Sequence, residues 1–153
     1  MNRRALFPLA LLLAAACASS SAMPGAKIPK PKVQIIARTN LAEVVPTVAT
    51  GIAVHYELRI TNVAEVPVTL TRADLDSMGG GGFNVASKTR LFNVTIQPGE
   101  TASADFDTTA YINDPLSYES RAPVAIRAQL LFDSPLGKVQ SIVQQRVSMY
   151  SGD

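Results

Sequence analysis

The chain has 153 residues, a formal net charge of +2 at pH 7 and one cysteine. Its 14 Lys and Arg residues face 12 Asp and Glu residues, and two arginines, Arg3 and Arg4, lie within residues 1–16, so the remainder is formally neutral. This balance argues against a nucleic-acid-binding surface, and one cysteine excludes an internal disulfide or a thiolate metal site. The remainder is long enough for a single domain with its own core.

Residues 1–16 have the pattern of an export signal. Asn2–Arg4 form a short positive start, and Ala5–Ala16 is an apolar run broken only by Pro8. Twelve helical residues cover about 18 Å, which is too short for a hydrocarbon core of about 30 Å. A charged start, a short apolar middle and a small-residue end are instead typical of a cleaved signal peptide.

The segment Ala14-Ala15-Ala16-Cys17 resembles a lipobox, the cleavage site of bacterial lipoproteins. The resemblance implies cleavage between Ala16 and Cys17, lipid chains on Cys17 and a stable membrane anchor. Lipoboxes usually carry leucine where this chain has Ala14, and small residues at 18–22 leave ordinary signal cleavage as the alternative. Because no aspartate follows the cysteine, the resemblance also implies the periplasmic face of the outer membrane in a Gram-negative host.

Residues 17–31 are predicted to be a flexible tether between the lipid and the domain. Ala18–Pro31 is rich in serine, proline and lysine, and such a segment buries too little apolar surface to fold. Fully extended, it would lift the domain at most about 40 Å from the bilayer. We therefore expect a signal over 1–16, a tether over 17–31, a β-domain over 32–150 and a tail over 151–153.

Beyond the tether, apolar residues recur with period two. Val33–Ala37 is a short strand candidate, and Ile52–Thr61 alternates over all ten residues, which favours a half-buried antiparallel strand. Asn62–Glu65 is predicted to be a turn, with Val66–Thr71 returning as the hairpin partner of the strand before it. Pro67 lacks an N–H, so either that strand lies at the edge of a sheet or the proline lies among the first residues of the strand.

Four later segments alternate in the same way: Phe92–Gln97, Ala102–Phe106, Val124–Phe132 and Val139–Met149. Pro98-Gly99 predicts a turn between the first two, and a slip in the last pattern near Ser141 predicts a bulge. No window has a helical period. About seven such strands predict an all-β fold, an antiparallel β-sandwich of immunoglobulin-like or fibronectin-like type.

Three segments, Tyr56–Asn62, Val66–Leu70 and Thr95–Thr101, resemble the late-embryogenesis-abundant type 2 (water-stress) domain. In that family a strand ends in asparagine, a paired strand follows, and an I-x-P-G-x-T turn comes later. The likeness runs from about Thr50 to Phe106, with Val63 where the family usually has proline. It implies a β-sandwich fold and a stress-protective role.

Few residues could carry catalysis or bind a metal. His55, the only histidine, is predicted on the outward face of its strand without a nearby serine motif, so we expect a surface residue and no enzyme activity. Asp74 and Asp76 precede the glycine run 79–82 and are weak calcium candidates. The third carboxylate and the closing glutamate of a calcium loop are missing, which favours two solvated acids, and no cofactor is expected.

The segments Ser77–Thr89 and Thr108–Ala122 are predicted to be long loops on a rigid sandwich, where binding proteins keep their contacts. The second contains the candidate binding residues Tyr111, Asn113, Tyr118 and Arg121, whose types are mostly enriched in interface hot spots. The same tyrosines could instead cover the open end of the core.

Taken together, the sequence predicts a lipid-anchored, non-enzymatic recognition or assembly protein of the cell envelope. Its expected partners are the membrane, through the N-terminal lipid, and another envelope protein, with no nucleic acid and no small-molecule substrate. The alternative is the stress-protective role implied by the water-stress domain.

Overall fold

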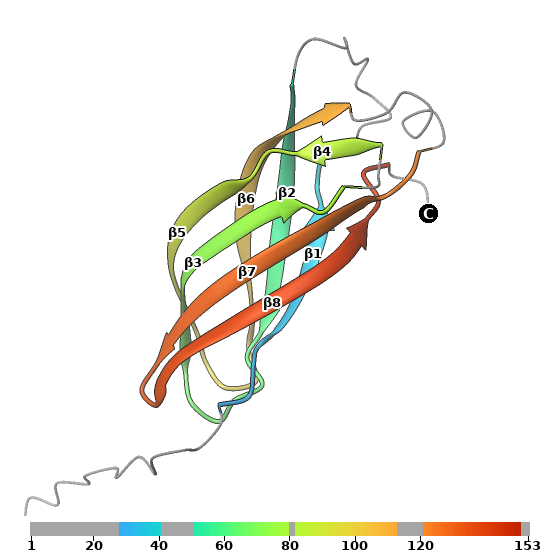
Figure 1. Ribbon diagram of the computed structural model, residues 1–153. Coiled ribbons are helices and arrows are strands. Elements are labelled where there is room, and N and C mark those ends of the chain that lie inside the picture. The colour runs from blue at the N-terminus through green and yellow to red at the C-terminus, as the bar shows by residue number, and fades with distance from the viewer. Residues whose placement is uncertain (1–27, 41–50, 80–81, 113–120, 151–153) are drawn as a thin grey trace, which may run out of the picture.

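The computed structural model describes residues 28–40, 51–79, 82–112 and 121–150, and all regular structure in these ranges is β-strand (Figure 1). The strands are β1 (Lys32–Ala37), β2 (Ile52–Thr61), β3 (Val68–Ser77), β4 (Phe83–Val85), β5 (Lys88–Ile96), β6 (Thr101–Ile112), β7 (Val124–Ser134) and β8 (Gly137–Val147). None of the described residues forms a helix able to cross a membrane.

Two antiparallel four-stranded sheets form the predicted β-sandwich, with eight strands in place of about seven. One sheet has the order β1-β2-β6-β4, and the other has the order β5-β3-β7-β8. Period-two alternation turns one face of each sheet toward the other and buries a shared core. Its largest fully buried side chains include Tyr56, Phe83, Phe106 and Phe132.

Strand pairing corrects one prediction. β3 is not the hairpin partner of β2, because β2 pairs with β1 and β6 while β3 pairs with β5 and β7. The chain crosses between the two sheets after Thr61. Pro67 directly precedes Val68, the first residue of β3, so its missing N–H interrupts no ladder in this central strand.

The predicted bulge near Ser141 is also wrong. β8 pairs with β7 without a break from Gly137 to Val147. Burial alternates regularly along this part of β8. Ser141 faces the core and Ile142 is 55% exposed, so the order of polar and apolar residues changes there while the backbone stays regular. The register shifts instead lie in β3, between Leu70 and Arg72.

Asn62 lies between the two sheets and joins two turns. Its side-chain amide donates hydrogen bonds to the carbonyl oxygens of Val66 (2.9 Å) and Ile96 (3.0 Å), and its Oδ1 accepts one from the Ala64 N–H (2.9 Å). The residue is fully buried. One side chain therefore holds the crossover from β2 to β3 and the end of β5.

The backbone of Asn62 completes the same junction. Its N–H donates to the carbonyl of Glu100 and its carbonyl accepts from the N–H of Gly99, both at 2.9 Å. Gly99 has a φ of 77°, which favours glycine because other residues carry a steric cost there. The crossover from β5 to β6 is thereby bonded to the crossover from β2 to β3.

Gln145 closes one side of the sandwich. Its Nε2 donates to the carbonyl of Ile35 (2.8 Å), and its Oε1 accepts from the Ile35 N–H (2.9 Å). A side-chain amide thus gives β1 the two hydrogen bonds that a neighbouring strand would supply. The edges of β1 and β8 cover each other.

We expect Asn62→Ala to lower the free energy of unfolding by about 3 kcal/mol, because two carbonyls and one N–H lose their partners inside the fold. Urea denaturation of the purified domain measures this. The exposed Asn93→Ala is the matched control and should change stability by less than about 0.5 kcal/mol. Equal effects of the two changes would show that the junction contributes nothing.

Candidate functional site

The strands of the sandwich end at two opposite poles, which are built from different connections. The tether pole consists of the start of β1, the connections 62–67 and 97–100, and the 134–137 hairpin; the described chain begins here at Ile28. The distal pole consists of the opposite strand ends, at Ala37, Ile52, Ser77, Ile112, Val124 and Val147. The long axis of the strands separates the two poles (Figure 1).

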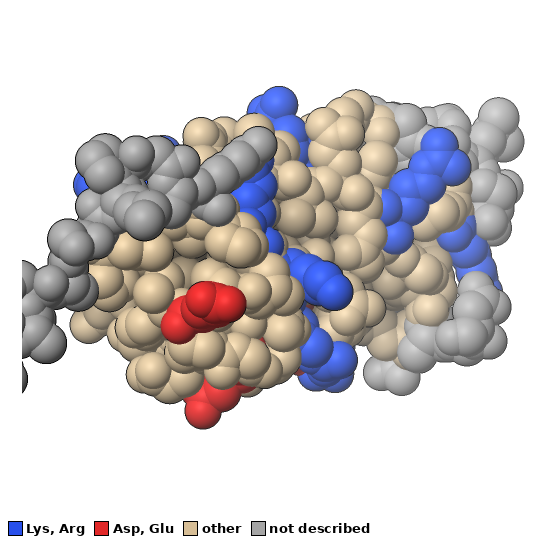
Figure 2. All heavy atoms as spheres, turned by 90° about the horizontal axis from the view of Figure 1, so that it is seen from below, with Lys and Arg blue, Asp and Glu red and all other residues tan. Residues whose placement is uncertain are grey.

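The tether pole is partly apolar. Ile28 and Pro29 lie against residues 63–66 and Leu136 around a hollow of about 330 Å³. Val63 is 40% exposed and Leu136 is 44% exposed. Seen from below, this end of the molecule carries both acidic and basic side chains (Figure 2), so it has no strong charge of one sign.

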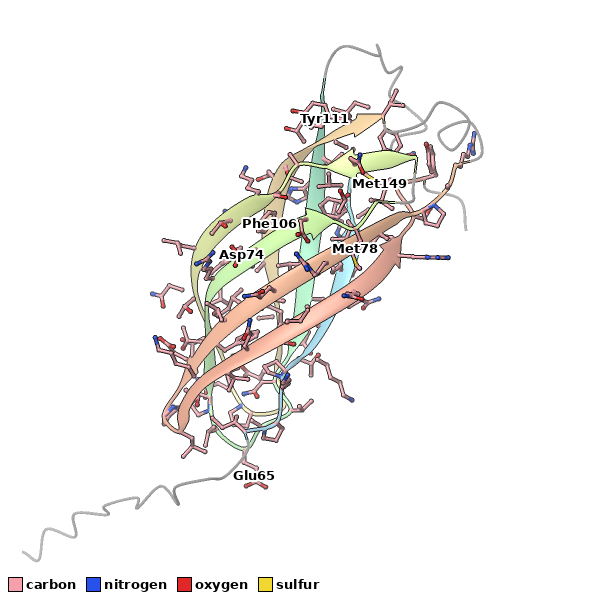
Figure 3. All side chains as sticks on the ribbon, in the orientation of Figure 1. Glu65, Asp74, Met78, Phe106, Tyr111 and Met149 are labelled. Atoms are coloured by element: carbon pink, nitrogen blue, oxygen red, sulfur yellow. The ribbon has the colours of Figure 1, made fainter. Side chains whose placement is uncertain are left out.

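Tyr111 lies at the distal pole but not in a loop. Residues 108–112 belong to β6, so the first five residues of the predicted loop are part of a strand. The Tyr111 side chain projects from the upper end of β6 and is 51% exposed (Figure 3). Its ring packs over Gly51, where an added Cβ would lie 2.9 Å from Tyr111 Cε1 and 2.3 Å from Thr109 Cγ2. Only glycine fits under the ring.

Arg121 is held by an aromatic contact at the same pole. Its guanidinium carbon lies 5.5 Å from the ring centroid of Tyr150, within cation–π range, and its φ is 55°. The C-terminal segment therefore supplies a partner that the sequence pattern did not indicate. The other two candidates in this segment, Asn113 and Tyr118, lie outside the described residues, as do Ala16 and Cys17.

The sequence predicts one long loop over Ser77–Thr89, but the structure has strand β4 within this segment. Residues Phe83–Val85 pair with β6 in the opposite sheet, and Phe83 is fully buried. Ser77 Oγ accepts a hydrogen bond from the Val85 N–H (3.0 Å). The segment crosses from one sheet to the other and returns, which leaves Met78, 53% exposed, at the distal pole.

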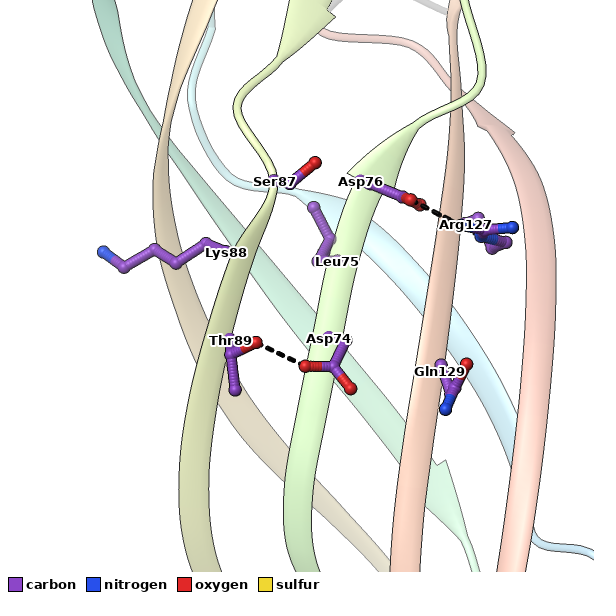
Figure 4. Close-up of a pocket in the computed structure, with 8 residues that line it drawn as sticks. All are labelled: Asp74, Leu75, Asp76, Ser87, Lys88, Thr89, Arg127 and Gln129. Carbon is purple, nitrogen blue, oxygen red and sulfur yellow. Dashed lines mark hydrogen bonds and ion pairs between the residues drawn. The ribbon is translucent and has the colours of Figure 1, made fainter.

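Asp74 and Asp76 lie on the outward face of β3, beside a hollow of about 160 Å³ (Figure 4). Asp74 accepts hydrogen bonds from Thr89 (2.5 Å) and Arg72 (2.8 Å), and Asp76 forms an ion pair with Arg127 (2.6 Å). Partial burial acts to raise the pKa of Asp74, but the Thr89 and Arg72 hydrogen bonds lower it overall.

Each of these two carboxylates already has a guanidinium partner, so a calcium ion would have to displace it. Across the ranges that the structure describes, no group of three or more His, Cys, Asp or Glu side chains is arranged to hold a metal. The arrangement fits solvated, ion-paired acids better than ligands of a hard cation.

His55 faces outward from β2, as its alternation predicts, but it is not an isolated surface residue. Its Nδ1 lies 2.5 Å from Asp107 Oδ1 and its Nε2 lies 3.4 Å from Asp105 Oδ1. The hydrogen bond with His55 lowers the pKa of Asp107. Both ring nitrogens thus face carboxylates from β6, so this cross-strand cluster offers no nitrogen to a nucleophile.

Glu57 is the residue on this face that the sequence pattern missed. Although it points outward from β2, its side chain is only 7% exposed because Arg38 and Arg59 cover it. Ser103 Oγ donates to its Oε1 at 2.6 Å. The Ser103 hydrogen bond, followed by the Arg38 contact, lowers the pKa of Glu57 from 4.5 to about 2. Alternation alone predicts an exposed acid here.

No family model matches this chain, and no curated protein matches it. Among solved structures, it is similar to a crystal structure of a protein from Archaeoglobus fulgidus, with 12% sequence identity and a TM-score of 0.40. The match covers 75% of this chain and 94% of that chain. A likeness of this size carries no argument about fold or function.

The lowered pKa of Glu57 predicts an acid-sensitive contribution to stability. The carboxylate stabilises the fold fully above the ordinary pKa of 4.5, and this contribution is lost as the pH falls through the folded pKa of about 2. Thermal unfolding measured across this window should show a shallower fall for Glu57→Gln than for the wild type.

Ser103→Ala removes the main cause of the shift and is the matched variant. It should move the loss of stability to higher pH, because Glu57 then titrates nearer its ordinary value. If the thermal stability of Glu57→Gln falls with pH as steeply as that of the wild type, the Glu57 carboxylate does not cause the acid sensitivity.

Proposed function

We propose that this protein is a lipid-anchored, non-enzymatic β-sandwich of the cell envelope that recognises or assembles with another envelope protein through its distal pole. The anchor is Cys17, exposed by cleavage after Ala16, and the location in a Gram-negative host is the periplasmic face of the outer membrane. The observation that carries the proposal is the separation of the two poles: the chain enters at one end, and Tyr111 and Arg121 lie at the other.

The dimensions of the sandwich support this arrangement. β2 has ten residues and β6 has twelve, so the distal pole lies about 33 Å or more beyond the end where the tether joins. A lipid at Cys17 therefore leaves the distal pole clear of headgroups. The rigid strands hold Tyr111 while the lipid restricts the protein to the membrane surface, which suits a tethered recognition domain.

The chemistry of the distal pole supports recognition by contact. Tyr111 is half exposed, Met78 lies nearby in the same group of strand ends, and Arg121 stacks on Tyr150. Tyrosine and arginine are enriched where partner proteins bind tightly. His55, the only histidine, is engaged by two carboxylates, which supports a non-enzymatic role.

The stress-protective role is the second candidate, and the structure offers it less support. Asn62 and Gly99, which carry the resemblance to the water-stress domain, are buried or placed in a turn that holds the fold together. The structural roles of Asn62 and Gly99 are enough to account for the shared motif, without a shared protective function. Protection of a test enzyme during drying by the purified chain, without any membrane partner, would favour this candidate.

We expect Cys17→Ser to move the protein from the membrane fraction to the soluble periplasmic fraction, because it removes the atom that carries the lipid. Cell fractionation with immunoblotting measures the change, and mass spectrometry of the N-terminal peptide of the wild type should show the added acyl mass. A variant that stays in the membrane to the same extent as the wild type would contradict the anchor.

We expect Tyr111→Ala together with Arg121→Ala to abolish chemical crosslinking to a defined envelope partner, while the fold and membrane location stay unchanged. Ile142→Ala is the matched control, because this exposed side chain lies on the outer face of β8, away from the distal pole. Crosslinks that survive the double change, or that disappear equally with Ile142→Ala, would contradict recognition by the distal pole.

A further inference from the structure

Apolar side chains from three separate segments meet at the tether pole. Val63 belongs to the connection between β2 and β3, and Leu136 belongs to the hairpin between β7 and β8. Both are among the six large apolar side chains that the described ranges leave exposed. They line one hollow together with Ile28 and Pro29, which directly precede β1. These four residues form one surface patch, the apolar tip.

Charged side chains surround the apolar tip. Glu65 is the one charged residue among the described residues that line the hollow, and it lies at the lower end of the domain (Figure 3). Lys30 and Lys138 line a second hollow, which shares Ile28 and Leu136 with the first. All three charged side chains are exposed. The tip is therefore an apolar patch with charges of both signs at its rim.

The proposed anchor joins the domain next to this patch. Residues 18–27 separate Cys17 from Ile28, and a chain of that length spans at most about 40 Å. Ile28 itself lines the hollow. A short linker of this kind makes contact with the anchoring surface intramolecular, with an effective concentration on the order of millimolar. The bilayer is thus the surface that the apolar tip meets most often.

We propose that the apolar tip docks on the bilayer that holds the lipid of Cys17, with Val63 and Leu136 inserted at the boundary between headgroups and acyl chains. The proposal rests on the proposed function, because the anchor brings the tip to the membrane. Zwitterionic headgroups complement the rim: their phosphates accept hydrogen bonds from the lysines, and their cationic groups attract Glu65. Lysine stems also lie along apolar surface while their charges stay in water.

Docking depends on the anchor. A single myristoyl chain gives only marginal, reversible membrane binding. Val63 and Leu136 together present less apolar surface than such a chain, so the unanchored domain stays in solution. The same two side chains are sufficient once the linker has brought them to the surface, because the loss of translational freedom is then already met by the anchor.

Docking also sets the orientation of the domain. A linker of up to about 40 Å would by itself allow the sandwich to lie on its side. Contact through the apolar tip points the strands away from the membrane. The distal pole, with Tyr111 and Arg121, then faces outward at about 33 Å or more from the headgroups.

The chain from Cys17 onward tests docking without relying on lipidation in the cell. Its one thiol is coupled to a maleimide lipid in phosphatidylcholine vesicles, and the chain has no tryptophan to mask a reporter. Leu136→Trp places a reporter on the apolar tip, and Ile142→Trp, the matched control, places one on the outward face of β8. With brominated acyl chains, fluorescence quenching at position 136 should exceed that at position 142 at least about twofold, because an interfacial apolar group lies about 5–10 Å deep.

Val63→Asp, added to Leu136→Trp, should reduce the quenching to the level of the control. Blocking the Cys17 thiol before vesicles are added should abolish it. Thermal unfolding of each variant confirms that the domain stays folded. Equal quenching at the two reporter positions overturns the proposal, and so does quenching at the tip that persists unchanged with Val63→Asp or with the blocked thiol.

Neutron reflectometry gives a second measurement with native side chains. The coupled chain on a supported phosphatidylcholine bilayer should form a protein layer that begins at the headgroups, whereas Val63→Asp together with Leu136→Asp should leave a water-filled gap. A gap under the native chain overturns docking. Because the thiol is coupled chemically, this result is separate from the membrane fractionation of Cys17→Ser, which tests the anchor itself.

Discussion

The whole sandwich depends on a buried amide. Asn62 bonds to the carbonyl that ends β5 and to both sides of its own turn, while its backbone holds the Gly99 turn. The crossovers from β2 to β3 and from β5 to β6, which lie at the tether pole, therefore meet at one residue. A two-sheet fold has no backbone hydrogen bonds between its layers, so it needs side-chain packing and junctions of this kind to set how the layers align.

The outward faces of the two sheets carry the charges, and these are organised in pairs. Glu57 pairs with Arg38 and Arg59, and Asp76 pairs with Arg127, while His55 lies between Asp105 and Asp107. Such pairs leave little net charge over the strands, which agrees with the neutral balance of the chain beyond residue 16.

The proposed function follows from position along the strands. The tether pole holds apolar turn residues beside the first described residues, and the distal pole presents Tyr111 and Arg121. Because the two poles lie at opposite ends of the strands, the proposed anchoring and the proposed recognition do not compete for one surface. The proposed anchor would gain its affinity from acyl-chain burial, and the proposed recognition from side-chain contacts.

The sequence by itself determined most of the residues that face the core, because side-chain direction in a strand follows the local backbone period. Ser141, which faces the core while Ile142 is exposed, departs from the apolar pattern. The bounds of β2 and the five inward residues of β7 were predictable for this reason. Only the tertiary structure decided that β3 leaves β2 for the other sheet, that Phe83–Val85 is a strand in the sandwich and that Glu57 is covered. The sequence predicts Tyr111 in a loop, whereas the structure has it on strand β6. The stacking of Arg121 on Tyr150 joins segments far apart in sequence. Strand partners and side-chain neighbours are set by long-range packing, which alternation along one segment does not encode.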